Sequence, residues 1–329
     1  MQHPHLKRFA VPAALAAVIA MSACGTTEEA GDGDKAASEA GPVSVTDFLG
    51  RTVELDAPAE KVVTLEWAEV EIVASLGVTP VGVADLEGYN LWVGGSVPVD
   101  DTATDVGTRQ EPSIDAIAGL GADLVIMETD DEAHIAAIEE FVPVLVVEGS
   151  SENDNLARMK RDVDMIAELL GKTPEAAALW GELEAKIAET AATIEAAGTG
   201  DLPFLFADGW VEGDAVSVRP FGTGSLVGSL ADAAGLENAW TGETDGVWGL
   251  GGTDVEGLAQ YTDTEMRFIF NNADGSDIFT EVLAGNAIWE GLSFVQNGDV
   301  YEMPQGIWMF GGPKSSEAIL DAIAEVYAS

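Results

Sequence analysis

The chain has 329 residues, of which 58 are acidic and 14 are lysine or arginine, so its formal net charge at pH 7 is −44. Such a surface repels nucleic acid and anionic lipid headgroups, which excludes both as partners, and it favours a basic docking partner. The single cysteine excludes an intramolecular disulfide, so stability must come from buried apolar area, and the length is sufficient for two hydrophobic cores.

The N-terminal segment is typical of an export signal. A basic start precedes an apolar run over residues 9–21, which at 13 residues is shorter than the ~20 that a membrane-spanning helix needs. Small residues then lead to Cys24, an arrangement similar to a bacterial lipoprotein signal. We expect residues 1–23 to be removed, Cys24 to carry lipid, and residues 24–43, rich in small and acidic side chains, to form a flexible tether. The alternative is an ordinary secretory peptide with an incidental cysteine.

Short apolar runs alternate with helical patterns in the first half of the chain. The runs, which we expect to form strands, are residues 61–65, 81–84, 123–127 and 144–147. Helices are expected at residues 67–76, 113–120 and 132–141. Apolar strands that are separated by helices predict a parallel sheet covered on both faces.

Two consecutive helices interrupt this alternation. Apolar residues at helical spacing over 155–170 end at Gly171. Thr173, followed by Pro174, is expected to cap a second helix that continues to Gly198. At 1.5 Å per residue this helix is ~36 Å long, enough to cross from one lobe to another.

Strands and helices then alternate again. We expect strands at 203–207, 215–218, 267–270 and 299–303, and helices at 223–234 and 315–327. The predicted fold is α/β, with two α/β lobes of mostly parallel strands bridged by one long α-helix. The N-terminal lobe covers residues 44–152, the helical connector 153–200 and the C-terminal lobe 201–329. Ligands of open α/β sheets bind beyond the carboxyl ends of the strands, so we expect the site between the lobes.

Several segments resemble a known family. In the first half they include Asp47–Leu55, Leu76–Asp85 and Val106-Gly-Thr-Arg-Gln-Glu-Pro-Ser113, and in the second half Ala287-Ile-Trp-Glu-Gly-Leu-Ser-Phe-Val-Gln-Asn-Gly298. The chain resembles the iron-siderophore substrate-binding lipoproteins of ABC importers, which are related to the vitamin-B12-binding proteins. Its second half is similar to the ferric-hydroxamate (ferrichrome-type) branch. The resemblance implies a class III periplasmic-binding-protein-like fold.

The same resemblance implies a function and partners. It describes a monomer on the extracytoplasmic face of the cell membrane, held there through a lipid anchor. Such a protein has no cofactor and is not an enzyme. It captures a ferric hydroxamate-type siderophore and delivers it to an ABC permease dimer with its ATPase, for iron uptake.

Candidate ligand contacts are Arg109, Trp92, Trp248 and Trp308. In the hydroxamate branch an arginine after the Val-Gly pair contacts the chelating oxygens, and tryptophans wall the cleft. The residues themselves fit, because a planar guanidinium donates to several oxygens and we expect all three rings in Gly-rich loop segments. The alternatives are a solvated arginine paired with an acid, and rings that cover the lobe surfaces. Arg219 is a second candidate donor.

The ligand and the docking residues leave alternatives open. The branch has aromatic residues where this chain has Met127-Glu-Thr-Asp-Asp131, which leaves the identity of the siderophore open. The scarcity of cations favours a neutral hydroxamate over a catecholate; cobalamin and haem are further alternatives.

The resemblance assigns permease docking to Asp115 and Glu256, each near a helix start, where any acid is favourable.

Metal binding and catalysis find little support in the residues. Beyond the expected signal the chain has one histidine, His134, whereas a site for unchelated iron or haem usually clusters histidine and tyrosine with carboxylates. Iron is therefore expected to arrive already chelated.

The alternative function from another class of protein is a lipid-anchored hydrolase. Such an enzyme would carry its nucleophile in a Gly-x-Ser-x-Gly motif, and the nearest segment, 222–228, has the wrong spacing.

Overall fold

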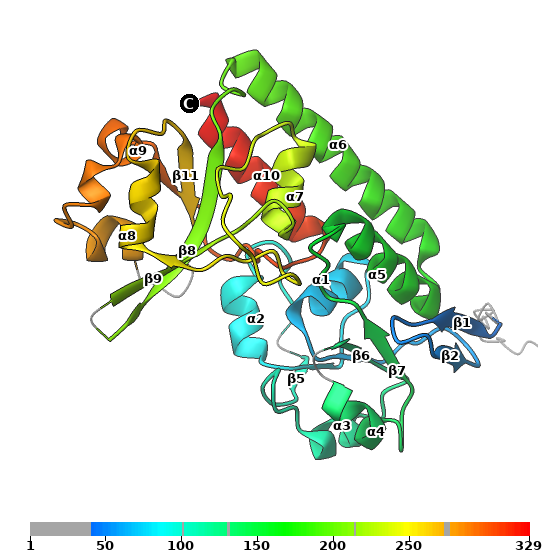
Figure 1. Ribbon diagram of the computed structural model, residues 1–329. Coiled ribbons are helices and arrows are strands. Elements are labelled where there is room, and N and C mark those ends of the chain that lie inside the picture. Colours follow the sequence, from blue (N-terminus) through cyan, green and yellow to red (C-terminus); the bar gives the residue numbers. More distant parts are fainter. Residues whose placement is uncertain (1–40, 101, 130–131, 214, 273–276) are drawn as a thin grey trace, which may run out of the picture. The chain divides into compact units, whose positions relative to one another are not determined.

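The computed structural model describes residues 41–100, 102–129, 132–213, 215–272 and 277–329 (Figure 1). The expected signal peptide, Cys24 and nearly all of the expected tether lie outside the described residues. The described residues fall within one compact unit. No helix among them combines the length and the apolar character that crossing a membrane requires.

Five parallel strands form the sheet of the N-terminal lobe, in the order β5-β4-β3-β6-β7. They are β3 (Val62–Thr64), β4 (Gly82–Val83), β5 (Thr104–Asp105), β6 (Leu124–Glu128) and β7 (Val144–Val147). Alternate side chains of these strands enter two cores. One lies against α1 (Trp67–Ser75) and α5 (Asn155–Leu170), and the other against α3 (Ile114–Leu120) and α4 (Glu132–Ile138). The expected two-sided burial is confirmed.

The sheet of the C-terminal lobe has the order β10-β9-β8-β11-β12. Its strands are β8 (Phe204–Glu212), β9 (Ala215–Pro220), β10 (Thr253–Asp254), β11 (Arg267–Phe270) and β12 (Val300–Glu302). β8, β11 and β12 are parallel, whereas β9 is antiparallel to both of its neighbours. The antiparallel pairing explains why β8 continues beyond the expected end at 207, since residues 207–212 pair with β9.

Helices cover both faces of this second sheet as well. One core packs it against α7 (Leu226–Ala233) and α10 (Pro313–Ala328). The other packs it against α8 (Val255–Leu258), α9 (Ser293–Asn297), η3 (Ile278–Val282) and η4 (Trp289–Gly291), with η2 (Ala259–Tyr261) following α8. α7 begins later than expected, because the Ser225 hydroxyl accepts a hydrogen bond from the Gly228 amide and caps the helix there.

The long connecting helix is α6 (Thr173–Ala197), which has 25 residues and is followed by Gly198 in the left-handed conformation. It lies beside α10 (Figure 1) and also packs on α5 and α7, so its buried Leu179 and Leu183 join a core that both lobes share. The predicted fold of two α/β lobes with one long helix is confirmed. The expected cap at Thr173 is wrong: Lys172 occupies that position and no side chain caps the helix. Pro174 has no N–H, and Glu175 places a negative charge in the first turn, which reduces the need for a cap.

Several short elements were not anticipated from the sequence, among them a hairpin and a helix that bear on the site. A hairpin of β1 (Val43–Thr46) and β2 (Thr52–Leu55) forms a separate two-stranded sheet, and its β1 packs on α5. A short helix, α2 (Leu86–Trp92), follows β4, with the Asp85 carboxylate capping its first turn. Trp92 therefore ends a helix and does not stand in a loop.

A buried carboxylate joins the two lobes. Glu71 of α1 accepts hydrogen bonds from the amides of Gly312, Lys314 and Ser315 at 2.9–3.0 Å and from the Ser315 hydroxyl at 2.5 Å. These groups begin α10, so the carboxylate caps that helix from another part of the chain. A Cβ at Gly311 would lie 2.6 Å from the carboxylate, so only glycine permits this approach. Burial raises the pKa of the Glu71 carboxyl, and the hydrogen bonds offset part of that rise.

We predict that Glu71→Ala destabilises the protein by at least about 2 kcal/mol, because buried donors at the start of α10 lose their acceptor. The free energy of unfolding from urea denaturation measures this. The control is Glu175→Ala, which removes an exposed acid from the first turn of α6 and should leave the midpoint nearly unchanged. Equal stability of the two variants would contradict the role of Glu71.

Candidate functional site

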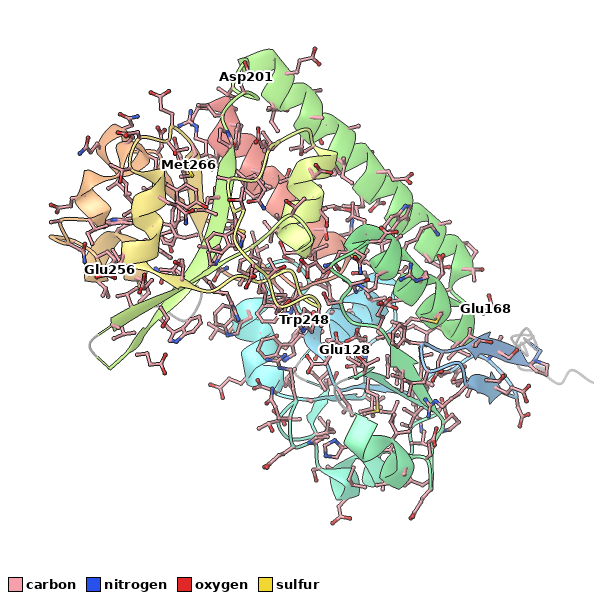
Figure 2. The ribbon with its side chains drawn as sticks, in the orientation of Figure 1. Glu128, Glu168, Asp201, Trp248, Glu256 and Met266 are labelled. Carbon is pink, nitrogen blue, oxygen red and sulfur yellow. The ribbon has the colours of Figure 1, made fainter. Side chains whose placement is uncertain are left out.

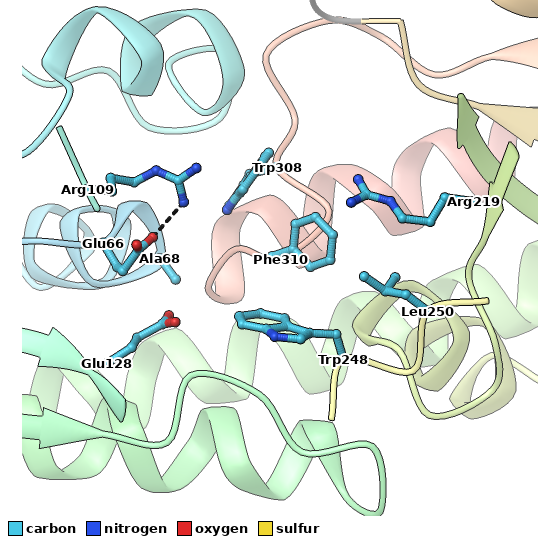
Figure 3. Close-up of a pocket in the computed structure, with 9 residues that line it drawn as sticks. All are labelled: Glu66, Ala68, Arg109, Glu128, Arg219, Trp248, Leu250, Trp308 and Phe310. Atoms are coloured by element: carbon cyan, nitrogen blue, oxygen red, sulfur yellow. Dashed lines mark hydrogen bonds and ion pairs between the residues drawn. The ribbon is translucent and has the colours of Figure 1, made fainter. Parts of the chain in front are cut away.

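A cavity of about 340 Å³ lies between the lobes (Figure 3). The described residues that line it come from both lobes: Glu66, Ala68, Arg109, Glu128, Arg219, Trp248, Leu250, Trp308 and Phe310. Glu66 follows β3 and Glu128 ends β6, so both stand at the carboxyl ends of adjacent parallel strands. Binding pockets of open α/β sheets form at such strand ends.

Arg109 is held on three sides. The Arg109 Nη1 donates to Glu66 Oε2 at 2.7 Å, and the guanidinium lies 4.0 Å from the ring centroid of Trp67 and 5.9 Å from that of Trp308. Its loop follows β5 and is closed by a bridge between Gly107 and Pro112. A guanidinium has five N–H donors, so the ion pair leaves donors for the oxygens of a ligand.

Arg219 faces the cavity from the C-terminal lobe. It stands on β9 and forms a two-point ion pair with Asp208 of β8, with Nε donating at 2.8 Å and Nη2 donating to the second oxygen. Its guanidinium lies 5.6 Å from the ring centroid of Phe310. Both cations of the pocket therefore already have a carboxylate partner before any ligand binds.

Aromatic rings form the wall between the two arginines. Trp308 contacts Phe310 at a centroid distance of 5.0 Å, and Phe310 contacts Trp248 at 5.4 Å (Figure 3). Trp308 also packs edge-on against Trp67 and Trp92, at 4.9 and 5.7 Å. Trp92 is half-buried against Trp308 and is not among the residues that line the cavity.

The loop that carries Trp248 is fixed by hydrogen bonds. One oxygen of Asp245 accepts from the amides of Val247, Trp248 and Gly249, at 2.7–3.0 Å. The Ser150 hydroxyl, which follows β7 of the other lobe, donates to the Val247 carbonyl at 3.0 Å. The ring is therefore positioned by both lobes.

A buried acid stands behind the pocket. Glu69 on α1 is fully buried, and neither of its oxygens has a hydrogen-bond partner among the described residues. Burial raises its pKa well above the ordinary value, and the charges of Glu66 and Asp162 raise it further, against a smaller opposing effect of Arg158. Glu69 therefore keeps its proton at a pH where an ordinary glutamate is ionised.

The structure brings Arg109, Arg219, Trp248 and Trp308 together and leaves the other candidates elsewhere. Asp115 and Glu256 are exposed in the first turns of α3 and α8. His134 lies on α4, which contributes no lining residue. The described residues contain no cluster of three or more side chains suited to a metal ion.

Sequence reasoning missed five of the lining residues, namely Glu66, Ala68, Glu128, Leu250 and Phe310. Both glutamates directly follow or end an apolar run that was assigned as a strand, so the strand-end rule could have found them. Phe310 stands two residues after Trp308 in the same Gly-rich segment, and nothing in that segment distinguishes its role from packing.

Two α/β lobes, a long connecting helix and a ligand-sized cavity between the lobes define a solute-binding protein. The model of the periplasmic binding protein family matches residues 62–306, and the chain belongs to that family. The resemblance seen in the sequence is thereby confirmed.

Individual relatives are similar over most of their length. The iron(3+)-hydroxamate-binding protein FhuD of Escherichia coli is 26% identical over 256 residues, which cover 78% of this chain and 83% of the relative. The Fe(3+)-citrate-binding protein YfmC of Bacillus subtilis is 25% identical over 319 residues, 95% of each chain. The crystal structure of the siderophore-binding protein FhuD of Vibrio cholerae with Fe³⁺-Desferal superposes with a TM-score of 0.71 at 25% identity, covering 82% of this chain and 98% of that one.

We predict that Glu69→Gln stabilises the protein increasingly as pH rises. The folded-state pKa of Glu69 is raised above 4.5, so its contribution to stability is present below that pH and is lost as pH rises through the folded-state pKa. Glutamine has no proton to lose. The difference in unfolding free energy between variant and wild type should grow by up to about 1.4 kcal/mol per pH unit in that range. Urea denaturation from about pH 4 to about pH 8 measures it, and parallel curves would contradict the assignment.

Proposed function

We propose that this protein captures a ferric hydroxamate-type siderophore in the cavity between its lobes and delivers it to an ABC permease for iron uptake. The observation that carries the proposal is a pocket that combines aromatic walls with two guanidinium groups already paired to carboxylates. Such a lining suits a ligand with an apolar body and a cluster of oxygens around its metal. The E. coli relative is an iron(3+)-hydroxamate-binding protein and the V. cholerae relative was crystallised with Fe³⁺-Desferal, and both support the same ligand class.

The charge of the pocket favours a hydroxamate over a catecholate. The described lining residues contain two arginines and two glutamates, and Asp208 adds a carboxylate behind Arg219. The formal charge around the cavity is therefore −1, within a chain of formal charge −44. A ferric trishydroxamate centre is neutral, whereas a ferric tris-catecholate is strongly anionic and would be repelled.

Arg109 is the proposed donor to the chelating oxygens. Its pairing with Glu66 and its stacking on Trp67 fix the plane of the guanidinium, so little side-chain entropy is lost when a ligand binds. Trp248 and Trp308 supply ring faces for the organic part of the chelate. Trp92 would then act indirectly, by supporting Trp308.

Delivery requires contact with the permease at the membrane. We propose that the exposed carboxylates of Asp115 and Glu256 dock on basic residues of the permease, one from each lobe. Lipidation at Cys24 would hold the protein at the extracytoplasmic face. Because α6 and Glu71 both tie the lobes together, closure around the ligand should be small.

The ligand class is tested by titrating the protein and following tryptophan fluorescence. Ferrichrome and ferrioxamine B should quench the emission, because Trp248 and Trp308 line the pocket. Ferric enterobactin, ferric citrate, cobalamin and haem should not. Binding of a catecholate, citrate, cobalamin or haem with no response to either hydroxamate would overturn the proposal.

Arg109→Ala should weaken binding of ferrichrome by roughly 10- to 150-fold, since a charge-assisted hydrogen bond contributes ~1.5–3 kcal/mol. Ferrichrome is the suitable probe because it is neutral, so the carboxylate of Glu66 that the substitution uncovers does not attract it. The control is Arg161→Ala, an exposed arginine paired with Glu148 outside the pocket, which should bind as the wild type does.

The docking assignment makes a separate prediction. Asp115→Lys combined with Glu256→Lys should stop siderophore-dependent iron uptake by cells, because reversed charges repel basic residues of the permease. Ligand affinity in the fluorescence assay should not change. The matched control reverses the exposed Glu168 and Glu175 instead and should leave uptake intact. Loss of ligand affinity in the first variant would argue against docking.

A further inference from the structure

The loop that carries Trp248 is tied to the opposite lobe. Every residue from 241 to 247 is exposed except Thr244, which is half-buried. The Thr244 hydroxyl donates a hydrogen bond to Glu152 Oε1. Glu152 lies between β7 and α5 and belongs to the N-terminal lobe, whereas Thr244 and Trp248 belong to the C-terminal lobe. The contact therefore joins the outer part of this loop to the lobe that faces it.

Close packing holds both partners of this hydrogen bond. A Cβ at Gly224 would lie 2.3 Å from the Cγ and from the main-chain oxygen of Glu152, so this glutamate packs directly on the backbone of residue 224. The Asn155 side chain donates to the Gly224 carbonyl at 3.1 Å and holds that turn in place. A Cβ at Gly222 would lie 2.8 Å from Thr244 Cγ2, so the methyl group of Thr244 packs there. With the methyl group on that side, the β-branched side chain directs its hydroxyl toward Glu152.

The position of Thr244 is transmitted to Trp248 along a short piece of chain. Asp245 directly follows Thr244, and one oxygen of its carboxylate accepts hydrogen bonds from the amides of Val247, Trp248 and Gly249. These bonds close the segment from 245 to 249 into one compact turn. A displacement of Thr244 therefore displaces the Trp248 ring, which lines the pocket.

An exposed loop adopts several conformations unless contacts restrict it, and ordering the loop when a ligand binds costs free energy. The bond between Thr244 and Glu152 has a carboxylate as its acceptor, and hydrogen bonds to ionised groups are stronger than those between neutral groups. It restricts the loop before a ligand arrives. The ring of Trp248 is then already in place to contact the ligand, and less free energy is lost on binding.

We propose that Glu152 is a positioning residue, which acts through Thr244 to hold the ring of Trp248 against the ligand. The inference rests on the proposed function, because it concerns the same pocket and the same ligand. Glu152 is not among the residues that line the cavity, so its effect on binding is indirect. Because the support comes from the other lobe, the placement of Trp248 and the affinity for the ligand depend on how the two lobes are arranged.

Ferrichrome binding to single variants, measured by isothermal titration calorimetry, tests the contact. Glu152→Ala should weaken binding roughly 3- to 10-fold, which is the range expected for the loss of one hydrogen bond. Thr244→Val keeps the methyl packing and loses the donor, so it should weaken binding to the same extent. Glu152→Gln keeps an acceptor for the Thr244 hydroxyl and should retain most of the affinity.

A double-mutant cycle separates positioning from a general structural role. When Trp248→Ala is already present, Glu152→Ala should change the affinity by less than about twofold, because the ring through which Glu152 acts is absent. A general loss of structure would weaken binding equally in both backgrounds. Calorimetry suits this comparison because its signal does not depend on the emission of Trp248.

The control variant is Glu168→Ala, which removes an exposed glutamate from α5, away from Trp248 (Figure 2). It should bind ferrichrome as the wild type does. Wild-type affinity of Glu152→Ala, or equal effects of this substitution with and without Trp248, would overturn the inference and leave the proposed function standing. Failure of the wild type to bind ferrichrome or ferrioxamine B would overturn both. If Glu152→Ala does not fold, Thr244→Val in the same cycle tests the contact from the other lobe.

Discussion

The carboxylate of Glu71 is the constraint on which the arrangement of the lobes depends. It belongs to the first helix of the N-terminal lobe and accepts four hydrogen bonds from the first turn of the last helix, α10. A carboxyl group buried this deeply needs such hydrogen-bond partners, because leaving it without them costs free energy. Trp308 and Phe310 lie in the segment just before α10. The same contact therefore also positions these two rings in the cavity. The hydrogen bonds of Glu71 therefore hold both the two lobes and the aromatic part of the pocket lining in place.

The second organising feature is the internal balance of charge in the pocket. Arg109 is paired with Glu66, and Arg219 with Asp208, each within its own lobe. These pairs hold the guanidinium planes before a ligand arrives, which lowers the entropy lost on binding. Glu69 lies fully buried on the same helix, and its raised pKa keeps it protonated where an ionised group would add further negative charge. The pocket thus keeps a small net charge inside a strongly acidic protein.

The sequence predicted the scaffold better than the site. The run 144–147 is apolar throughout and the run 267–270 is apolar after Arg267, and both appear as strands with those same bounds. The helix over 155–170 is also found as expected, because its apolar period and Gly171 are local signals. The β1–β2 hairpin was missed although its residues alternate between exposed and inward-facing positions, because each of its strands has only four residues.

Contacts between distant parts of the chain explain the remaining differences. The Glu71–Gly312 hydrogen bond joins residues 241 positions apart, and no local sequence pattern predicts it. Arg109, Trp248 and Trp308 were named from loop context and resemblance, whereas the support of each by Glu66, Asp245 or Trp67 depends on tertiary packing. Trp92 was assigned to a loop because the capping of α2 by Asp85 was not recognised.

The packing of Trp308 on Trp67 and Trp92 has a consequence for how the protein is made. A ribosome releases the N-terminal lobe first, yet one ring of its aromatic cluster and the donors for Glu71 come from residues 308–315. Until those residues have been synthesised, the N-terminal lobe exposes the rings of Trp67 and Trp92, and the Glu71 carboxylate lacks the amide donors of α10. Native structure in the first half is therefore completed by nearly the last segment translated.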